Sequence, residues 1–304
     1  MGGAHVNYTS LKNPPQRMRT LWALNFIAFA VHAGMGTAVI VYGSKRENVD
    51  IRLNVLRGIY EDGNVNVYQV HRPAMRQTSL VLLCASFAFV SAFAHFAIVV
   101  ATFRSAVSQK VLYEANWYYN GLFESKVVFW RYLEYALSAP IMIVAMMLLA
   151  GISSVDSLSL SFAAQSAVML CGWLTEEYAA LYPYAADGET ADHSRTWRLR
   201  MVPYALGWFI YVPTWVVFLA SFYGNVAASK AHNGTEGPPS FVYAIIVGEV
   251  VIFTLFALPL PLYQRKGYYD KYWQTEIIYA VLSLLAKTFL NGMLLWYVFG
   301  DRDD

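Results

Sequence analysis

Seven stretches of this sequence are long and apolar enough to cross a lipid bilayer, and this property restricts the fold more than any other. A membrane-spanning helix needs about 20 mostly apolar residues. Backbone N–H and C=O groups cannot stay unpaired in lipid, so each stretch is expected to be helical. Only 14% of the residues are charged, against about 25% in soluble domains. The sequence therefore predicts an all-α membrane protein, a seven-transmembrane helix bundle. The expected spans are 21–42, 79–103, 127–149, 158–182, 201–223, 241–263 and 275–299.

Lysines and arginines between the spans predict the orientation of the bundle. Cytoplasmic loops carry an excess of these residues. With the N-terminus inside, the short loops and tails hold twelve of them inside and two outside, while the long loop 44–78 adds six outside. We therefore expect a cytoplasmic N-terminal segment at 1–20, one seven-helix domain at 21–300 and an extracellular tail at 301–304. A net charge of +2 and the lack of a basic motif argue against nucleic acid as a partner; membrane lipid is the expected surrounding.

The long loop carries the sequence IYEDGNVNVYQV (59–70). Apolar residues alternate with polar ones on both sides of the turn-forming Asp62-Gly63-Asn64, which indicates a short β-hairpin on the extracellular side. A solvated loop without strands is the alternative interpretation.

Charged residues inside the expected spans are few. A charge at the centre of a bilayer costs about 2.5–3.5 kcal/mol on insertion scales, so each such residue is a candidate for function. Glu177 and Glu276 lie near helix ends, where we expect them to cap a helix or reach the interface. The set is Arg131, Glu134, Glu176, Glu177, Glu249, Glu276 and Lys287, together with the ionisable His32 and His95.

Lys287 lies near the middle of the last span, in the sequence SLLAKTFLNG (283–292). One interpretation is structural: the ammonium group pairs with a buried carboxylate and holds helices together. The other is chemical: an amine that apolar surroundings keep neutral and nucleophilic can form a Schiff base with an aldehyde. Ser283 and Asn291 lie four residues to either side and share its helix face. A protonated Schiff base would then need a counterion.

The third span supplies a carboxylate for that cation. Arg131, Glu134 and Ser138 are spaced i, i+3, i+7 and form one stripe on the helix. Glu134 is the expected partner of Lys287, and Arg131 is expected to favour the charged form of Glu134. A purely structural Arg131–Glu134 pair is the alternative.

His32 and His95 lie inside the first two spans. A single buried histidine is usually a hydrogen-bonded core residue, which is the simpler interpretation. Two at comparable depth, in a bundle with Glu134, also predict a cluster that can accept a proton.

Four segments of the sequence resemble the heliorhodopsins, a family of inverted, microbial-type retinal proteins. EIIYAVLSLLAKTFL is similar to the lysine helix of that family, and RYLEYALSAPIM to its counterion helix. FVYAI is similar to the start of its sixth span, and GWLTEEY to the end of its fourth. The cytoplasmic N-terminus, which rests on charge counting, fits the inverted orientation of the family.

The resemblance implies a role for each matching residue. Lys287 would carry all-trans-retinal through a Schiff base, with Glu134 as counterion and Ser138 beside the chromophore. His32 and His95 match the paired histidines of the proton-accepting region. The resemblance also places Glu176 at the cytoplasmic end of the fourth helix, and it implies that the first-loop hairpin takes part in a homodimer.

Two positions depart from the family pattern. The serine-rich stretch after the counterion is here Ser138-Ala139-Pro140, with less hydroxyl content. Glu249, in IIVGEVVIF, replaces a residue that is usually apolar. The simple interpretation is a carboxyl group that burial keeps protonated and that bonds to a neighbouring helix. The functional one is a proton-transfer group on the far side of Lys287 from Glu134.

Three classes of function remain open at this stage. The first is a heliorhodopsin-type light sensor that signals to a partner the sequence does not identify. The second is light-gated passive conduction of protons or other ions, which would use Glu134 and Glu249 on opposite sides of the Schiff base. The third, a receptor or transporter without retinal, lacks the receptor-type motifs and paired broken helices expected of it. The sequence predicts no enzyme active site and no metal site.

Overall fold

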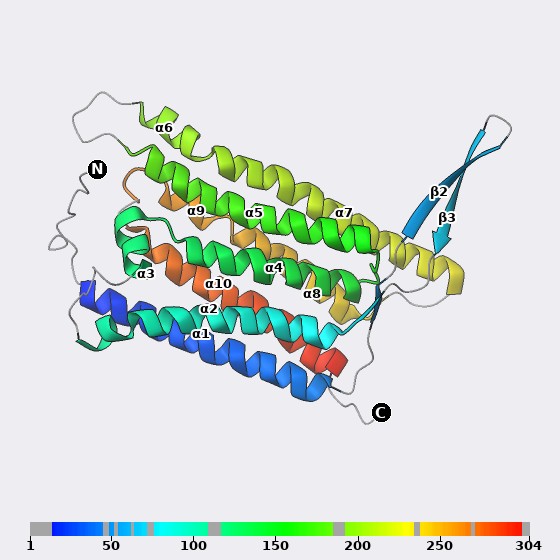
Figure 1. Cartoon of the computed structure of the whole chain (residues 1–304), viewed down its shortest axis with the longest axis horizontal. Coiled ribbons are helices and arrows are strands. Elements are labelled where there is room, and N and C mark those ends of the chain that lie inside the picture. The colour runs from blue at the N-terminus through cyan, green and yellow to red at the C-terminus, as the bar shows by residue number, and fades with distance from the viewer. Residues whose placement is uncertain are drawn as a thin grey trace.

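Seven long helices form the body of the protein, and each is long and apolar enough to cross a membrane (Figure 1). The computed structural model describes residues 14–44, 49–51, 54–61, 64–71, 76–108, 117–184, 192–233, 238–268 and 271–299. The long helices are α1 (Pro14–Gly43), α2 (Leu80–Ser108), α4 (Phe129–Leu149), α5 (Val155–Leu181), α7 (Val202–Asn233), α8 (Ser240–Leu255) continued by α9 (Pro259–Tyr263), and α10 (Trp273–Leu294) continued by a π-helical turn, η5 (Leu295–Phe299).

All seven expected spans are present, with ends that differ by a few residues. The largest differences are at α1, which begins at Pro14 inside the expected N-terminal segment 1–20, and at α7, which continues to Asn233. Residues 1–13 and the tail 301–304 lie outside the described residues.

The two ends of the bundle carry different elements (Figure 1). The start of α1 lies at the same end as α3 (Trp117–Tyr119), α6 (His193–Arg200) and α9, which we call the α6 end. The strands lie at the opposite end, the hairpin end, where α10 finishes. The sequence predicts that the α6 end faces the cytoplasm, and this stays a prediction.

The first loop contains the hairpin that the sequence predicts, and it is longer than expected. Strand β2 (Asn54–Glu61) pairs antiparallel with β3 (Asn64–His71), and β1 (Val49–Ile51) pairs with β4 (Arg76–Thr78) nearer the bundle. Residues 62 and 63, at the expected turn, lie outside the described part of the chain. That the hairpin is extracellular stays a prediction.

Proline and glycine set two local features that matter for the site. The sixth span is interrupted between Leu255 and Pro259, because proline lacks an N–H and disfavours helix in the residue before it. Gly248 lets α8 approach α10: a Cβ there would lie 2.6 Å from Cε1 of Phe289. The two helices therefore pack closely where the Phe289 ring meets Gly248.

Two apolar clusters fill the interior. The larger one joins α2, α4, α7, α8 and α10 and includes Met142, Trp215 and Leu290. The smaller one lies at the α6 end and includes Met18 and Tyr118. Except for Arg200 of α6, the buried charged residues of the described chain lie in the membrane-spanning helices.

Candidate functional site

Lys287 and Glu134 form a buried ion pair between α10 and α4. The Lys287 side chain is 3% exposed, and its Nζ donates to Glu134 Oε1 at 2.8 Å. It also donates to Ser283 Oγ at 2.7 Å, one helical turn earlier. Nζ lies 5.3 Å from the centre of the Tyr135 ring, within range of a cation–π contact. The pairing that the sequence predicts is thus present in the fold.

Two serine hydroxyls hold the Glu134 carboxylate in place. Ser138 Oγ donates to Oε1 at 2.8 Å from the next turn of α4, and Ser91 of α2 donates to the same oxygen. Such bonds matter because a buried ion pair is tolerated only when the remaining hydrogen-bonding capacity of its members is satisfied. Sequence reasoning missed Ser91; its position four residues before His95, on the same face of α2, was the available signal.

The paired histidines come together beside this carboxylate. The rings of His32 and His95 stack with centroids 5.5 Å apart and an interplanar angle of 18°. His95 Nδ1 lies 2.8 Å from Asn25 Oδ1, and the His95 ring interacts electrostatically with Glu134. Neither His32 nitrogen has a hydrogen-bond partner among the described residues. The stacked histidine pair therefore places two ionisable rings within electrostatic range of Glu134.

Arg131 does not pair with Glu134, which corrects the sequence-based expectation. Its guanidinium forms ion pairs with Glu176 of α5 and Glu276 of α10. Nη2 also donates to the Tyr272 hydroxyl at 2.9 Å. The interpretation of Glu276 as an end cap that reaches the interface is wrong, because this residue is 7% exposed and paired with Arg131.

Tyrosines complete what we call the Arg131 cluster, made of Arg131, Glu176, Glu276, Tyr118, Tyr132 and Tyr272. Tyr118 donates to Glu276 Oε2 at 2.8 Å, and Tyr132 to Glu176 Oε1 at 2.7 Å. The backbone N–H of Val128 donates to Glu176 Oε2 at 2.9 Å. Glu176 does lie near the end of its helix, as the resemblance implies, but it is buried and bonded. The cluster joins α3, α4, α5 and the start of α10.

Glu249 lies on the other side of Lys287, toward the hairpin end. It is fully buried in α8, and neither carboxyl oxygen has a hydrogen-bond partner among the described residues. The neighbouring Gly248 packs against the Phe289 ring of α10, two residues beyond Lys287, and Glu249 interacts electrostatically with Lys287. Asn291, one turn beyond Lys287, is likewise fully buried without a described partner. The expected bond from Glu249 to a neighbouring helix is not found within the described residues.

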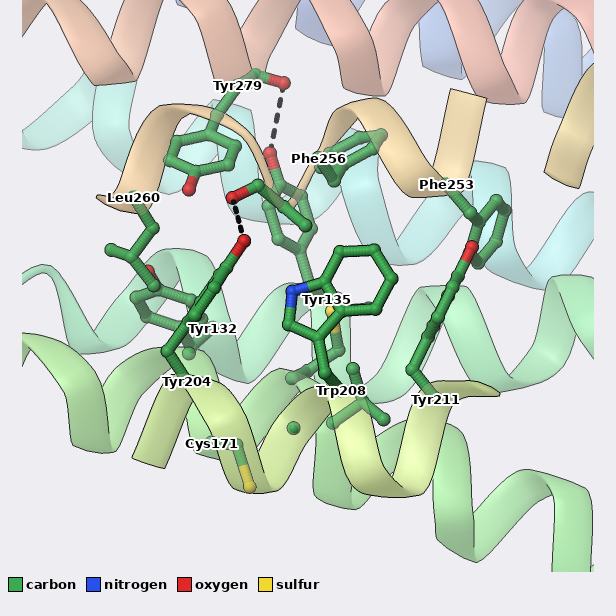
Figure 2. A pocket seen from close by; sticks show the side chains of 15 residues that line it. Tyr132, Tyr135, Cys171, Tyr204, Trp208, Tyr211, Phe253, Phe256, Leu260 and Tyr279 are labelled. Atoms are coloured by element: carbon green, nitrogen blue, oxygen red, sulfur yellow. Dashed lines mark hydrogen bonds between the residues drawn. The ribbon is translucent and has the colours of Figure 1, made fainter. Parts of the chain in front are cut away.

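An aromatic cavity opens directly at Lys287. The part next to the lysine has about 20 Å³ of open space, and it shares four lining residues with a larger part of about 80 Å³ between α5 and α7. Figure 2 shows the larger part, where Tyr135 donates to the carbonyl of Tyr279 at 3.1 Å and Tyr204 to that of Ala257 at 3.2 Å. The shared residues are Tyr135, Met169, Phe253 and Phe256.

Trp208 lies across this cavity in Figure 2, among Tyr135, Tyr204 and Tyr211. From the sequence, Trp208 is a candidate to line a retinal, together with Trp173 and Trp215. None of the three is predicted as a site residue, because aromatic residues in spans more often serve packing or anchor a helix at the interface. The described part of the chain contains no group of three His, Cys, Asp or Glu side chains arranged to hold a metal ion.

Two solved structures have a fold similar to that of this chain. The crystal structure of Exiguobacterium sibiricum rhodopsin matches with a TM-score of 0.60 and 13% identity, over 93% of this chain and 97% of that one. The crystal structure of a cyanorhodopsin from the cyanobacterium Tolypothrix sp. matches with a TM-score of 0.52 and 13% identity, over 93% and 95%. At this identity the likeness shows the seven-helix fold alone.

A family model narrows the class. The heliorhodopsin family model matches residues 21–302, nearly the whole chain, and the chain therefore belongs to the heliorhodopsin family. A search of curated proteins found no match. Family and fold together identify an integral, multi-pass membrane protein of the light-sensing, retinal-binding class.

Proposed function

We propose that this protein is a light sensor that carries all-trans-retinal as a Schiff base on Lys287, with Glu134 as the counterion. One observation carries the proposal: a buried lysine, 2.8 Å from a buried carboxylate, opens onto an aromatic cavity. A structural ion pair would need no cavity at the amine. Closing that space with apolar side chains would instead be favourable.

The residues present fit this cofactor. Retinal is an apolar polyene with an aldehyde, and the site offers one amine at the end of a cavity lined by aromatic and thioether side chains. Met142 and Met169 line the part next to Lys287, and their flexible side chains can rotate to admit an extended chain of atoms. Bound retinal would supply light absorption and isomerisation.

The protein's own residues would then hold and move the proton. Glu134 balances the positive charge at Lys287, and Ser91 and Ser138 fix the carboxylate by donating to it. When the proton leaves Lys287, the histidine pair would offer acceptors on the Glu134 side, with His95 the member that interacts with Glu134. Glu176 and Arg131, which belong to the Arg131 cluster, would set the field at the far end of this path.

Absorption spectroscopy tests this proposal. Purified protein mixed with all-trans-retinal is expected to develop a visible band, and Lys287→Ala is expected to lose it completely. Glu134→Gln removes one partner of a buried pair, a loss of about 3–5 kcal/mol. This should shift the protonation equilibrium at Lys287 by roughly two to four powers of ten and move absorption into the near ultraviolet at neutral pH.

Glu134→Asp is the matched control, since it keeps the charge and should keep most of the visible band. A visible band that survives in Lys287→Ala would contradict the proposal. A complete lack of any band in the parent would leave the receptor or transporter class without retinal.

A second candidate function, light-gated passive conduction of protons or ions, rests on Glu249. A buried carboxyl without a hydrogen-bond partner costs free energy, about 1–3 kcal/mol, so a compensating role is expected. Glu249 and Asn291 place polar groups on the hairpin side of Lys287, opposite Glu134. Together they could extend a proton path through the bundle.

Membrane current under illumination separates the two functions. The conduction hypothesis expects a light-dependent current that reverses with voltage and falls at least about tenfold in Glu249→Gln, the substitution that removes the ionisable group but keeps the shape. Glu177→Gln, the same substitution at a glutamate near the end of α5, is a matched control that should leave the current unchanged. A current near zero in the parent at every voltage would remove this function and leave the sensor.

We also propose that the α6 end, where α1 begins, faces the cytoplasm, because of the Lys and Arg count in the loops. We also propose that two copies pair through the hairpin region and that a partner protein receives the signal, both on the family resemblance.

A further inference from the structure

A basic pocket of about 300 Å³ opens at the α6 end, outside the spans. It is separate from the Lys287 cavity, with which it shares no lining residue. It is bounded by the start of α6 and by the segment that follows α9. Its lining residues are Tyr184, His193, Ser194, Trp197, Arg265 and Lys266, none of which is acidic.

The walls of this pocket are fixed by a fully buried arginine. Arg200 Nε donates to the Tyr182 carbonyl at 2.8 Å, and Nη1 to the Gln264 carbonyl at 3.3 Å. Its guanidinium lies 4.1 Å from the centre of the Tyr184 ring, and Tyr184 donates to the same Gln264 carbonyl at 2.9 Å. The two chain segments that form the pocket are therefore tied together before any ligand arrives.

Two nitrogen donors at the pocket have no acceptor within the described part of the chain. Lys266 Nζ lies 3.0 Å from His193 Nε2. An ammonium group can only donate, so Nε2 accepts and the proton of a neutral His193 is on Nδ1. His193 Nδ1 is buried and has no hydrogen-bond partner among the described residues, and the same holds for Trp197 Nε1. An indole N–H is a donor only.

The charged side chains that line this pocket are positive. Arg265 lies over the Trp197 ring at 5.5 Å, which brings a second cation to the same wall. The nearest described carboxylate in sequence, Asp192, is used as the N-cap of α6: its Oδ1 accepts from the Arg195 N–H at 2.9 Å. The start of α6 adds the positive end of a helix dipole.

We propose that this pocket binds a phosphate-type oxyanion, presented either by an anionic phospholipid headgroup or by a free phosphate. A tetrahedral oxyanion accepts several bonds at once, and it would satisfy the His193 and Trp197 donors while it pairs with Arg265 and Lys266. Arginine beside lysine is a common combination for phosphate recognition. The position of the pocket next to the ends of membrane-spanning helices makes both sources accessible.

Lipid retention and phosphate binding distinguish the two sources. In one arm, the protein is reconstituted into nanodiscs of phosphatidylglycerol or of phosphatidylcholine and then released. Native mass spectrometry counts the lipid molecules that stay bound to each protein molecule. In the other arm, inorganic phosphate is titrated into lipid-free protein in detergent and the shift in melting temperature is recorded, with chloride at matched ionic strength as reference. Circular dichroism of each variant without ligand confirms folding.

The double variant Arg265→Gln/Lys266→Gln is expected to lower affinity at least about tenfold, because it removes two charge-assisted bonds. Trp197→Phe keeps the ring under Arg265 and removes one N–H, so a loss of about fivefold is expected. Arg198→Gln, on the exposed face of α6, and Lys230→Gln, at the far end of α7, each remove one charge outside the pocket. Both controls should change affinity by less than about twofold.

Each outcome decides the proposal. Selective retention of phosphatidylglycerol that is lost in the double variant assigns the pocket to a lipid headgroup, and a phosphate-dependent stabilisation lost in the same variant assigns it to a free phosphate. The proposal is overturned if neither probe binds, or if Arg198→Gln weakens binding as much as the pocket variants do.

Discussion

The Arg131 cluster and the Glu249 region both hold buried carboxyl groups, but they satisfy them in opposite ways. In the Arg131 cluster, each of two carboxylates has an arginine partner and a tyrosine hydroxyl. Glu249 has no described hydrogen-bond partner, and neither has nearby Asn291. A hydrogen-bonded cluster that joins four elements can hold these elements in fixed positions. A carboxyl without a hydrogen bond lowers stability and is retained only if it serves another purpose.

The Lys287–Glu134 pair lies between these extremes. Its atoms are bonded, yet the amine also borders open space. A site that must exchange a proton needs both properties: bonds that fix the resting state, and room for an alternative one. The free energy of unfolding can therefore be compared for variants of the Arg131 cluster and of Glu249. The comparison separates charges that stabilise the fold from charges that are kept for function.

The largest expected effect comes from Arg131→Met. This change leaves Glu176 and Glu276 buried together without their cation, and the free energy of unfolding should fall by about 3–5 kcal/mol. Reversible unfolding of the detergent-solubilised protein, followed by circular dichroism, measures it.

The matched control for this prediction is the triple variant Arg131→Met/Glu176→Gln/Glu276→Gln. It removes all three charges together, so most of the lost stability should return. If Arg131→Met alone unfolds no more easily than the parent, the Arg131 cluster does not stabilise the fold, and its contrast with Glu249 is contradicted.

A smaller loss is expected for Tyr118→Phe. The substitution keeps the ring but removes the hydroxyl that donates to Glu276, a charge-assisted bond worth about 1.5–3 kcal/mol. Tyr42→Phe, on an exposed part of α1, is the control and should stay within about 0.5 kcal/mol. Equal effects at the two positions would show that α3 contributes nothing through this bond.

The smallest expected change in the free energy of unfolding is an increase, whereas the changes above are decreases. Glu249→Leu replaces an unbonded buried carboxyl by an apolar side chain of similar size, and we expect a gain of about 1–2 kcal/mol in the free energy of unfolding. The same unfolding experiment measures it, with Asn291→Leu as a second substitution of this kind. A clear loss of stability in Glu249→Leu would mean that this carboxyl is bonded and structural like the others.

Much of the central site could be predicted from the sequence, because its signals are local. A lysine and a glutamate stand out inside apolar spans, and the four-residue spacing to Ser283 and Ser138 identifies the bonding neighbours on the same helix face. Partners on other helices, such as Ser91 and Asn25, are harder to predict, since a serine or asparagine in a span is common and its facing helix is unknown. The four-residue spacing of Ser91 to His95 gives its helix face but not its partner on α4.

Arg131 shows why local spacing was misleading. Arg131 and Glu134 do share a stripe, but side chains on a helix lean toward its N-terminus. Arg131 lies in the first turn of α4, so its long side chain points toward the α6 end and away from Glu134. There it meets Glu176 and Glu276, which come from near the end of α5 and the first turn of α10.

The sequence by itself determined the seven spans, the hairpin and the lysine–glutamate pairing, because hydropathy, alternation and the cost of buried charge act over short distances along the chain. The tertiary structure alone decided which buried charged groups form ion pairs and which have no hydrogen-bond partner among the described residues. That choice depends on the depth and rotation at which helices distant in sequence face one another, and close packing, as at Gly248 against Phe289, sets both.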